Sequence, residues 1–510
     1  MIVAEQQDVI AFLSEPSNWS GKVDSVDKIE THGSMVFLGG DRALKMKRAV
    51  KYDYMDFSSL QRRRQCCEAE LVINRRTAPM LYRRVRRVTR EADGRLTLDG
   101  AGDVVEWLVE MTRFDQDLLF DRLARVGKLT VPLIERLADT IAAFHREAEV
   151  DKSVGGASAF STLVSGNAHD LAPHLGKLTN GNLVATIVEK QRAAIQLHHD
   201  RLDACRDAGW VRHCHGDLHL GNICLIDNQP VLFDAIEFND SLAVVNVLYD
   251  VSFAIMDLAY RDLAEFANLL MSRYFAHVPD LGCLALMPLF LSCRAMVRAK
   301  VLAELASIGK ATADDPLLAA AGYIRLAERY LAPSAPRLIA LGGVSGTGKS
   351  TVARALAPEV DNPPGALVLR SDVQRKIMLG QSPLTRLGVK DYAPEVSAKV
   401  YAELAARAAQ AVAAGRSVIV DAVHARPEER SALAAMAEGL GVRFDGFWLT
   451  APRQTLVDRI GGRRDDVSDA DVGVLEEQLK SDFDGSEWQA IDASTTTTNI
   501  VGKMLSLMRR

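Results

Sequence analysis

The sequence predicts two parts of different fold class. The first is an α+β part with a small β-rich lobe and a helical lobe, and the second is an α/β part built on a doubly wound parallel sheet. Three observations predict this division: strand-like runs separated by turns between residues 26 and 111, apolar residues at helical spacing after Gln116, and strand–loop–helix alternation from Arg337. A chain of 510 residues also exceeds the size that one hydrophobic core supports.

The small lobe is expected to contain a short sheet and one helix. Turn signals at Gly33-Ser34 and Gly39-Gly40-Asp41 separate the first strand-like runs. A helix is expected from Ser58 to Arg76, between the third strand and the fourth. The expected strands are Val26–Thr31, Met35–Leu38, Arg42–Lys47 and two runs near residues 84–90 and 104–111.

The segment that follows is expected to be mostly helical. Apolar residues recur at helical spacing in residues 117–145 and 183–204, and the Gly/Ser/Asn-rich stretch 153–168 between them is expected to be a loop. Residues 241–332 are expected to be all-helical. Two prolines in residues 333–336 cannot continue the preceding helix, so this segment is interpreted as a linker. The predicted domains are therefore residues 1–332, with lobes of about 1–112 and 113–332, and residues 337–510.

Composition is that of an ordinary globular protein, with 48% hydrophobic and 25% charged residues. Seven cysteines without a CxxC pair predict reduced thiols and a cytoplasmic location. The first 30 residues lack the basic and apolar regions of a secretion signal. The most apolar run, Leu281–Cys293, has 13 residues and contains Pro288, so we expect a buried helix and no membrane association.

Positive charge is concentrated in one segment. Residues 42–95 carry 16 Lys and Arg against 6 Asp and Glu, a local excess of +10 within a net charge of −5. The densest part is Arg83-Arg84-Val85-Arg86-Arg87. A solvated face and a dock for an anionic substrate or partner both fit this pattern. Specific binding of nucleic acid is not expected, because the rest of the chain is acidic.

A first set of residues with the chemistry of phosphoryl transfer begins at residues 215–222, His-Gly-Asp-Leu-His-Leu-Gly-Asn. This reaction needs a group that orients the attacking hydroxyl, metal ligands, and cations for the nucleotide phosphates. Asp217 is placed to accept the hydroxyl proton, and Asn222 can ligate magnesium. Apolar runs on both sides of Asp227-Asn228 predict a hairpin that returns Asp234 beside Asn222 as a second magnesium ligand.

This segment resembles the aminoglycoside phosphotransferase family, a branch of the kinase-like fold, over roughly residues 25–310. The residues that carry the resemblance are His215-Gly216-Asp217 with Asn222, then Phe233-Asp234. By that resemblance Asp217 is the catalytic base, and Asn222 and Asp234 hold magnesium.

The same resemblance implies several nucleotide-binding residues in the small lobe. A lysine on the third strand would meet the ATP phosphates; Lys45 fits, and Lys47 lies on the same strand face as the alternative. Its carboxylate partner on the helix would be Glu70, or Glu68 in a shifted register. Ser34, in the turn His32-Gly33-Ser34, would cover the phosphates.

Other interpretations of this half remain open. His213, His215 and His219, with Cys214 nearby, could form a zinc cluster, although the kinase interpretation explains Asp217, Asn222 and Asp234 together. His215 would then orient the loop, with Asp250 bracing it or capping its own helix. His145 is expected to be a core histidine. A kinase fold without catalysis is a further alternative.

The second set is a complete phosphate-binding loop. The apolar run Leu338–Leu341 is followed by residues 343–350, Gly-Val-Ser-Gly-Thr-Gly-Lys-Ser, and then by a helical pattern, which is the context of a Walker A motif or P-loop. Lys349 would reach the β- and γ-phosphates, and Ser350 would ligate magnesium with Asp421, the carboxylate that ends the apolar run Val418–Asp421. The predicted nucleotide-binding residues are Gly343, Gly346, Gly348, Lys349, Ser350 and Thr351.

The segment from Val368 to Lys376 resembles the small-molecule P-loop kinases, such as gluconate kinase and adenylylsulfate kinase, and the zeta-toxin group. The resemblance covers about 170 residues. It implies that Asp372 orients the substrate hydroxyl and that Arg375 grips substrate or phosphate. Arg459 and Arg463 lie in a segment that resembles the lid of these kinases and would close over the transferred phosphate.

Two further residues are expected near the substrate of the second domain. His424 and Arg426 follow Asp421 at the C-terminal end of a strand, where ligands of α/β sheets bind, so either could touch substrate. A capping or surface role fits His424 equally well. A regulatory or motor ATPase is the alternative to a kinase on the same fold.

Together these motifs predict a bifunctional ATP-dependent phosphotransferase that resembles a bacterial fusion of the two kinase domains. Each domain would use ATP or GTP with Mg²⁺ to phosphorylate a hydroxyl of a small molecule, such as a sugar, an amino-alcohol or a related metabolite. Tandem kinases indicate two successive phosphorylations or control of one domain by its neighbour. The alternative is an ATP-switched regulatory or binding protein with a macromolecular partner.

Overall fold

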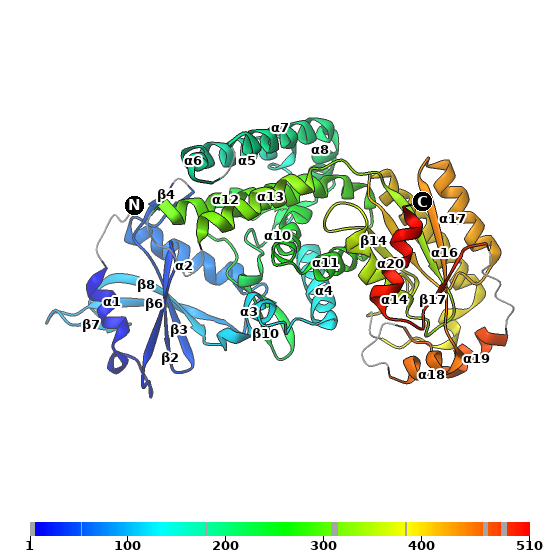
Figure 1. Cartoon of the computed structure of the whole chain (residues 1–510). Helices are drawn as coiled ribbons and strands as arrows, with labels where there is room; N and C mark the ends of the chain where they lie inside the picture. Colours follow the sequence, from blue (N-terminus) through cyan, green and yellow to red (C-terminus); the bar gives the residue numbers. More distant parts are fainter. Residues whose placement is uncertain are drawn as a thin grey trace. The chain divides into compact units, whose positions relative to one another are not determined.

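The computed structural model forms two compact units, whose elements carry the labels of Figure 1. The first unit comprises Met1–Leu129, Ala143–Gly155 and Arg206–Val251, and the second comprises Thr130–Ala142, Gly156–Cys205 and Ser252–Arg510. The structure describes residues 6–52, 54–178, 181–307, 315–382, 385–462, 468–480 and 487–509.

A six-stranded antiparallel sheet in the order β1-β2-β3-β8-β6-β7 forms the centre of the first unit. Its strands are β1 (Val26–Glu30), β2 (Ser34–Gly39), β3 (Arg42–Lys47), β6 (Tyr82–Arg90), β7 (Leu96–Leu98) and β8 (Asp103–Thr112). Successive side chains of β2 point to opposite faces of the sheet. Phe37 packs with residues of α1 (Gln7–Ser14) on one face, and Leu38 packs with residues of α2 (Leu60–Asn74) on the other. All five predicted strands are confirmed.

Helix α2 positions one of the predicted site residues. The helix begins after Ser59, whose hydroxyl accepts the N–H of Arg62 at 3.3 Å. Its buried residues Arg63, Cys67, Glu70 and Asn74 are spaced by four, three and four, so they share the face that packs on β6 and β8. This register points Glu70 into the unit, whereas Glu68 is exposed and pairs with Arg64.

Two short antiparallel ladders frame the loop at residues 214–222. Strand β9 (Val211–His213) pairs with β12 (Val244–Asn246), and β10 (Ile223–Ile226) pairs with β11 (Gln229–Leu232). Asp227 and Asn228 join β10 to β11 with φ of +49° and +59°, the left-handed turn that suits a two-residue hairpin. The predicted hairpin is confirmed, and β12 interrupts the segment 241–332 that was expected to be all-helical.

One helix of the second unit lies where a loop was expected. The stretch 153–168, expected to be a loop, contains most of α5 (Gly156–Leu171). Its composition is loop-like, but Phe160 and Val164 stand four residues apart and are buried, and the Phe160 ring stacks on Phe290 of α12 (Met287–Ser307) at 4.7 Å. Packing of this apolar face therefore overrides the weak helix propensity of Gly, Ser and Asn.

The apolar run at residues 281–293 lies in a core helix, as expected. The continuous helical segment Leu281–Ser307 is long and apolar enough to cross a membrane by length and composition, but 72% of its most apolar stretch is buried inside the structure. It packs against α13 (Pro316–Tyr330), α5 and α7 (Gly181–Leu197). Burial among these helices accounts for its apolar composition.

A five-stranded sheet in the order β14-β15-β13-β16-β17 follows, and each of its neighbouring pairs is parallel. Its strands are β13 (Arg337–Gly342), β14 (Leu367–Arg370), β15 (Val418–Asp421), β16 (Arg443–Thr450) and β17 (Gln489–Asp492). Figure 1 shows α14 (Lys349–Leu356) and α20 (Thr497–Met508) on one face, with α16 (Pro394–Ala413) and α17 (Pro427–Gly439) on the other. The predicted α+β and doubly wound α/β classes are both confirmed.

The outer strand β14 is covered by a helix that precedes the sheet in the chain. Asn268 of α11 (Ala264–Ala276) donates hydrogen bonds of 2.8 Å to the carbonyls of Pro364 and Ala366, and the Ser272 hydroxyl accepts the N–H of Val368 at 3.0 Å. These side chains satisfy edge groups that would otherwise be unpaired. The second compact unit therefore includes α11 together with the sheet, while the domain boundary at residues 333–336 stays a prediction.

Candidate active sites

The first site gathers Asp217, Asn222 and Asp234, as the motif spacing predicts. The Asn222 amide donates to the Asp217 backbone carbonyl at 2.9 Å and to Asp217 Oδ2 at 3.0 Å. The β10–β11 hairpin brings the chain back, so that the N–H of Phe233 bonds the carbonyl of Asn222 at 3.0 Å and Asp234 follows directly. The Asp217 side chain is 39% exposed and therefore open to an acceptor molecule.

A buried carboxylate braces the loop that carries Asp217. Asp250, in the first turn of α10 (Val247–Tyr260), accepts the N–H of His215 at 3.1 Å and that of Gly216 at 2.9 Å. His145 lies 3.1 Å from the same carboxylate and is 3% exposed, as expected for a core histidine. Burial lowers the pKa of His215, whose Nε2 lies 2.9 Å from the Phe233 carbonyl. Asp250 therefore braces the loop rather than only capping its helix.

The contacts of Asp250 also provide evidence on the alternative that this segment binds zinc. Among the described residues, the group with metal-ligating spacing is His145, Cys214 and Asp250, not the histidines at 213, 215 and 219. Two backbone N–H groups and His145 already occupy the Asp250 carboxylate. A hydrogen-bonded brace therefore explains the cluster without a metal.

Two buried lysines share Glu70. Lys45 Nζ lies 2.7 Å from Glu70 Oε1 and also pairs with Asp234, and Lys47 Nζ lies 2.5 Å from Glu70 Oε2 and pairs with Glu237. Burial alone would lower the pKa of Lys45, but Asp234 and Glu70 raise that pKa well above its usual range. The predicted contact of Lys45 with Glu70 is confirmed, and Lys45 rather than Lys47 faces the predicted metal ligand Asp234.

The Lys47–Glu237 pair was not predicted. Lys47 is 2% exposed and its ammonium lies 5.2 Å from the centre of the Phe57 ring. Burial raises the pKa of the Glu237 carboxyl, while the Lys47 ammonium opposes that shift. Glu237 lies three residues after Asp234, but the sequence contains no signal that joins it to Lys47 across 190 positions.

The turn at His32-Gly33-Ser34 lies near the predicted catalytic residues. Burial lowers the pKa of His32, and the carboxylates of Asp217 and Asp234 oppose that shift, which places the ring within electrostatic range of both. The Ser34 N–H donates to Thr31 Oγ1 at 2.9 Å, and Ser34 pairs with Lys47 across the β2–β3 ladder. Ser34 is 7% exposed, and its contact with phosphates stays a prediction.

The arginine-rich run is largely ion-paired. Arg84 Nε lies 3.0 Å from Glu110, Arg86 Nε lies 2.8 Å from Asp99, and Arg83 pairs with Asp41 at 3.1 Å. These three carboxylates lie outside residues 42–95, so neighbouring segments offset part of the local excess of positive charge. Both a solvated face and a dock for an anion stay predictions.

The second site is built on the P-loop between β13 and α14. Gly343, Gly346 and Gly348 have φ of +130°, +85° and +87°, a region that side chains disfavour. A Cβ on Gly343 would also lie 2.5 Å from the Leu449 carbonyl. Lys349 Nζ donates to the carbonyls of Gly343 at 2.8 Å and Val344 at 3.1 Å, so the ammonium lies within the loop.

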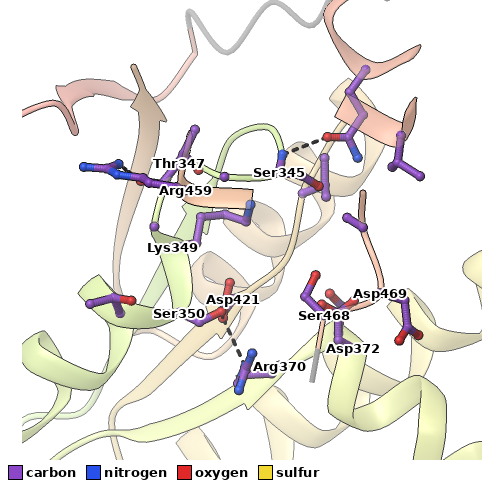
Figure 2. A pocket seen from close by; sticks show the side chains of 18 of the residues that line it. Ser345, Thr347, Lys349, Ser350, Arg370, Asp372, Asp421, Arg459, Ser468 and Asp469 are labelled. Atoms are coloured by element: carbon purple, nitrogen blue, oxygen red, sulfur yellow. Dashed lines mark hydrogen bonds and ion pairs between the residues drawn. The ribbon is translucent and has the colours of Figure 1, made fainter. Parts of the chain in front are cut away.

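The predicted metal-binding pair of this site is in direct contact. Ser350 Oγ donates to Asp421 Oδ2 at 2.6 Å. Ser350 lies in the first turn of α14, which follows the P-loop after β13, and Asp421 ends the adjacent parallel strand β15. A hydroxyl and a carboxylate are hard oxygen ligands, and the glycine cradle with Lys349 suits phosphates. These residues therefore fit a magnesium–nucleotide complex. Figure 2 shows them with Asp372 and Arg459 around one cavity.

That cavity measures about 1020 Å³ and unites most of the residues predicted for the second site. Its lining includes Gly346, Gly348, Lys349, Ser350, Thr351, Asp372, Arg375, Asp421 and Arg459. Arg459 donates to the Thr347 carbonyl at 3.3 Å and to the Ala493 carbonyl at 2.9 Å, so its guanidinium binds backbone beside the P-loop. Arg463, its predicted companion, lies outside the described residues.

The residues predicted to meet the acceptor, Asp372 and Arg375, both line the cavity. Burial raises the pKa of Asp372, with Arg370 opposing and Asp421 reinforcing the shift. Arg375 is 5% exposed, lies 4.6 Å from the centre of the Tyr392 ring and donates to the Asp391 carbonyl at 2.8 Å. The sequence analysis did not predict Asp469. Its carboxylate accepts hydrogen bonds from Lys376 Nζ at 3.1 Å and from the Tyr392 hydroxyl at 2.8 Å. Because these partners are distant in the chain, no local pattern indicates them.

His424 and Arg426 do not line this cavity. His424 has φ of +51° and is 1% exposed, with its ring 5.7 Å from Tyr401 and 5.1 Å from Trp488. Burial lowers its pKa to about 3, so the ring is neutral. Arg426 precedes α17, and its N–H donates to Glu429 at 3.4 Å. Neither residue therefore lines this cavity, although the preceding Val423 does, and the expectation that either could touch substrate stays a prediction without support from this geometry.

A family model described as an AAA domain matches residues 338–482. An uncharacterized protein of Mycobacterium tuberculosis is 26% identical over 495 residues, which are 95% of each chain. A gluconokinase from Sinorhizobium meliloti 1021 is 24% identical, with a TM-score of 0.26, over 34% of this chain and 94% of its own. A choline/ethanolamine kinase family protein from Mesorhizobium loti is 12% identical, with a TM-score of 0.40, over 64% of this chain and 94% of its own.

The family match falls on the parallel sheet and the P-loop, and the first unit carries the β-rich lobe with its Asp217 loop. The chain thus joins a part with a β-rich lobe and the Asp217 loop to a P-loop domain that the AAA-domain model matches over residues 338–482. Membership of the kinase families that the motifs resemble stays a prediction.

Proposed function

We propose that the chain is a bifunctional ATP-dependent phosphotransferase, each domain transferring the γ-phosphate of ATP to a hydroxyl of a small molecule. One observation carries this proposal: each compact unit contains its own set of side chains whose chemistry suits phosphate and a hydroxyl. Lys45 and Asp217 lie near the predicted metal ligands Asn222 and Asp234, and Lys349 and Asp372 line one cavity with the predicted ligands Ser350 and Asp421. A sugar, an amino-alcohol or a related metabolite would be the acceptor.

In the first site, Asp217 would orient the acceptor hydroxyl and receive its proton. Asn222 and Asp234 would hold Mg²⁺, which neutralises phosphate charge when bound. Lys45 contacts both Glu70 and Asp234, so it is positioned to direct its ammonium toward the phosphates beside the metal ligands. Asn222 also donates to Asp217, and this hydrogen bond fixes the orientation of the carboxylate.

In the second site, Lys349 would exchange the loop carbonyls for the β- and γ-phosphates. Ser350 and Asp421 would hold Mg²⁺, and Asp372 would receive the proton of the acceptor hydroxyl. The raised pKa of Asp372 favours this role, because a base works best when its pKa approaches the operating pH. Arg375 supports an oxygen-rich or anionic acceptor, since its buried guanidinium lines the cavity and pairs with a carbonyl rather than a carboxylate.

A metabolite extract incubated with the full chain and MgATP tests this function. We expect acceptors that gain one or two phosphates in mass, and the products should divide into a set lost with Asp217→Asn and a set lost with Lys349→Ala. Absence of any phosphorylated product, with ATP bound by both sites, would instead support the ATP-switched regulatory or binding protein.

A further inference from the structure

The second site contains a cation that its motifs do not predict. Arg370 ends β14 and is paired in register with Asp421 on β15, so the two side chains leave the same face of the sheet. Arg370 Nε lies 3.5 Å from Asp421 Oδ2, the oxygen that also accepts the Ser350 hydroxyl (Figure 2). A guanidinium therefore stands against the carboxylate that is assigned to magnesium.

Glu135 lies against the other end of this guanidinium. It belongs to α4 (Val131–Glu147), and its Oε1 lies 3.7 Å from Arg370 Nη1. The two side chains are only 14% and 19% exposed, so water screens this pair less than a surface ion pair. Arg370 thus connects a carboxylate of α4 with a carboxylate of the P-loop site, all within the second compact unit.

Two sets of contacts hold the elements that carry Glu135 and Arg370 in place. Asp139, four residues after Glu135, accepts two hydrogen bonds from Arg273 of α11, at 2.8 and 2.9 Å. The same helix α11 holds β14 through Asn268 and Ser272. The helix with Glu135 and the strand with Arg370 are therefore both attached to α11, which keeps the two elements beside each other.

We propose that Glu135 is a positioning residue of the second site, acting through Arg370 on Asp421. The inference rests on the proposed function of the P-loop. A positive charge beside a metal ligand opposes the binding of Mg²⁺, and Glu135 offsets that charge while it orients the guanidinium. Glu135 lies within residues 1–332, so a residue of the predicted first domain tunes metal binding in the second.

The test is Glu135→Gln in the full chain, followed by binding of the ATP analogue AMP-PNP across a Mg²⁺ titration. The AMP-PNP binding that is lost in Lys349→Ala is taken as binding at the second site. We expect the Mg²⁺ concentration at half-saturation to rise about three- to tenfold, as for the loss of one partly shielded ion pair. Binding in the presence of a chelator should not change. Glu147→Gln, which removes an exposed carboxylate from the same helix, should leave the titration unchanged.

A double-mutant cycle separates action through Arg370 from a general structural effect. In an Arg370→Gln background, Glu135→Gln should cause no further shift, because the cation that it balances is gone. Glu135→Asp keeps the charge and should recover most of the wild-type Mg²⁺ dependence, which also answers any loss of folding by the glutamine variant. The role of Glu135 is overturned if Glu135→Gln has the same Mg²⁺ dependence as the wild type. It is also overturned if Glu135→Gln causes an equal shift with Arg370 and with Arg370→Gln. Neither result bears on the proposed function of the P-loop. Absence of Lys349-sensitive binding in the wild type overturns the proposed function of the P-loop as well.

Discussion

Replacing Glu70 with glutamine should destabilise the first unit and its nucleotide site together. The carboxylate is 0% exposed and contacts two lysines, at 2.7 and 2.5 Å. Removing its charge leaves Lys45 with Asp234 and Lys47 with Glu237, so each ammonium retains one partner. Removal of one partner from a buried ion pair costs about 3–5 kcal/mol, and the retained partners place this case near the lower end, at about 3 kcal/mol.

The loss should appear locally as well as in nucleotide binding. Hydrogen exchange measured by mass spectrometry on peptides from β3 and α2 reports the opening free energy of this region. A loss of about 3 kcal/mol raises the exchange of the most protected amides by about two orders of magnitude, since about 1.4 kcal/mol is tenfold. Binding of MgAMP-PNP at the first site should weaken too, because Lys45 would then pair more closely with Asp234.

Glu68→Gln is the matched control on the same helix. Its carboxylate is 50% exposed and pairs with Arg64 at i,i+4, so its removal should change stability by less than about 0.5 kcal/mol. Equal exchange rates for the two variants, or an unchanged rate for Glu70→Gln, would refute the conclusion that Glu70 links the two lysines.

Three further changes should affect the sites separately. Asp217→Asn should reduce the rate of transfer at the first site by about 10²–10⁴, while the nucleotide affinity of that site stays nearly unchanged. Steady-state rates and an AMP-PNP titration measure these two quantities. An undiminished rate of transfer would remove Asp217 from the role of base. Lys349→Ala should abolish nucleotide binding at the P-loop, measured by calorimetry, and leave first-site turnover intact; an equal fall of both activities would mean that the sites are coupled. Turnover at the second site should fall as pH decreases through the pKa of Asp372, which burial raises above the ordinary 3.8, because the protonated carboxyl cannot accept the hydroxyl proton. A pH–rate profile with no acid limb down to about pH 4 would assign the proton to another group.

Local patterns predicted most of the fold and the residues that are fixed by strand or helix register. The alternation of β3 placed Lys45 and Lys47 on one face. The choice between Glu70 and Glu68 stayed open in the sequence, and the register of α2 in the structure buries Glu70 and exposes Glu68. The Asp227-Asn228 turn predicted the hairpin that carries Asp234 to Asn222. These features depend on neighbours within a few residues, which the sequence displays directly.

Residues whose partners are distant in the chain escaped prediction. Glu237 meets Lys47, and Glu135 meets Arg370, through tertiary packing that leaves no local pattern. Helix α5 has a loop-like composition and forms because its apolar face is buried. His424 follows a strand at the ligand-binding edge, but its left-handed backbone turns the ring between Tyr401 and Trp488.

The number of nucleotides bound by one chain tests the central claim most directly. Titration calorimetry with AMP-PNP and Mg²⁺ should give two nucleotides per wild-type chain, one at each set of phosphate-handling residues. Lys349→Ala should bind one, and Asp217→Asn should still bind two, because Asp217 handles the acceptor rather than the nucleotide. A single nucleotide per wild-type chain, or two per Lys349→Ala chain, would contradict the presence of two separate nucleotide sites.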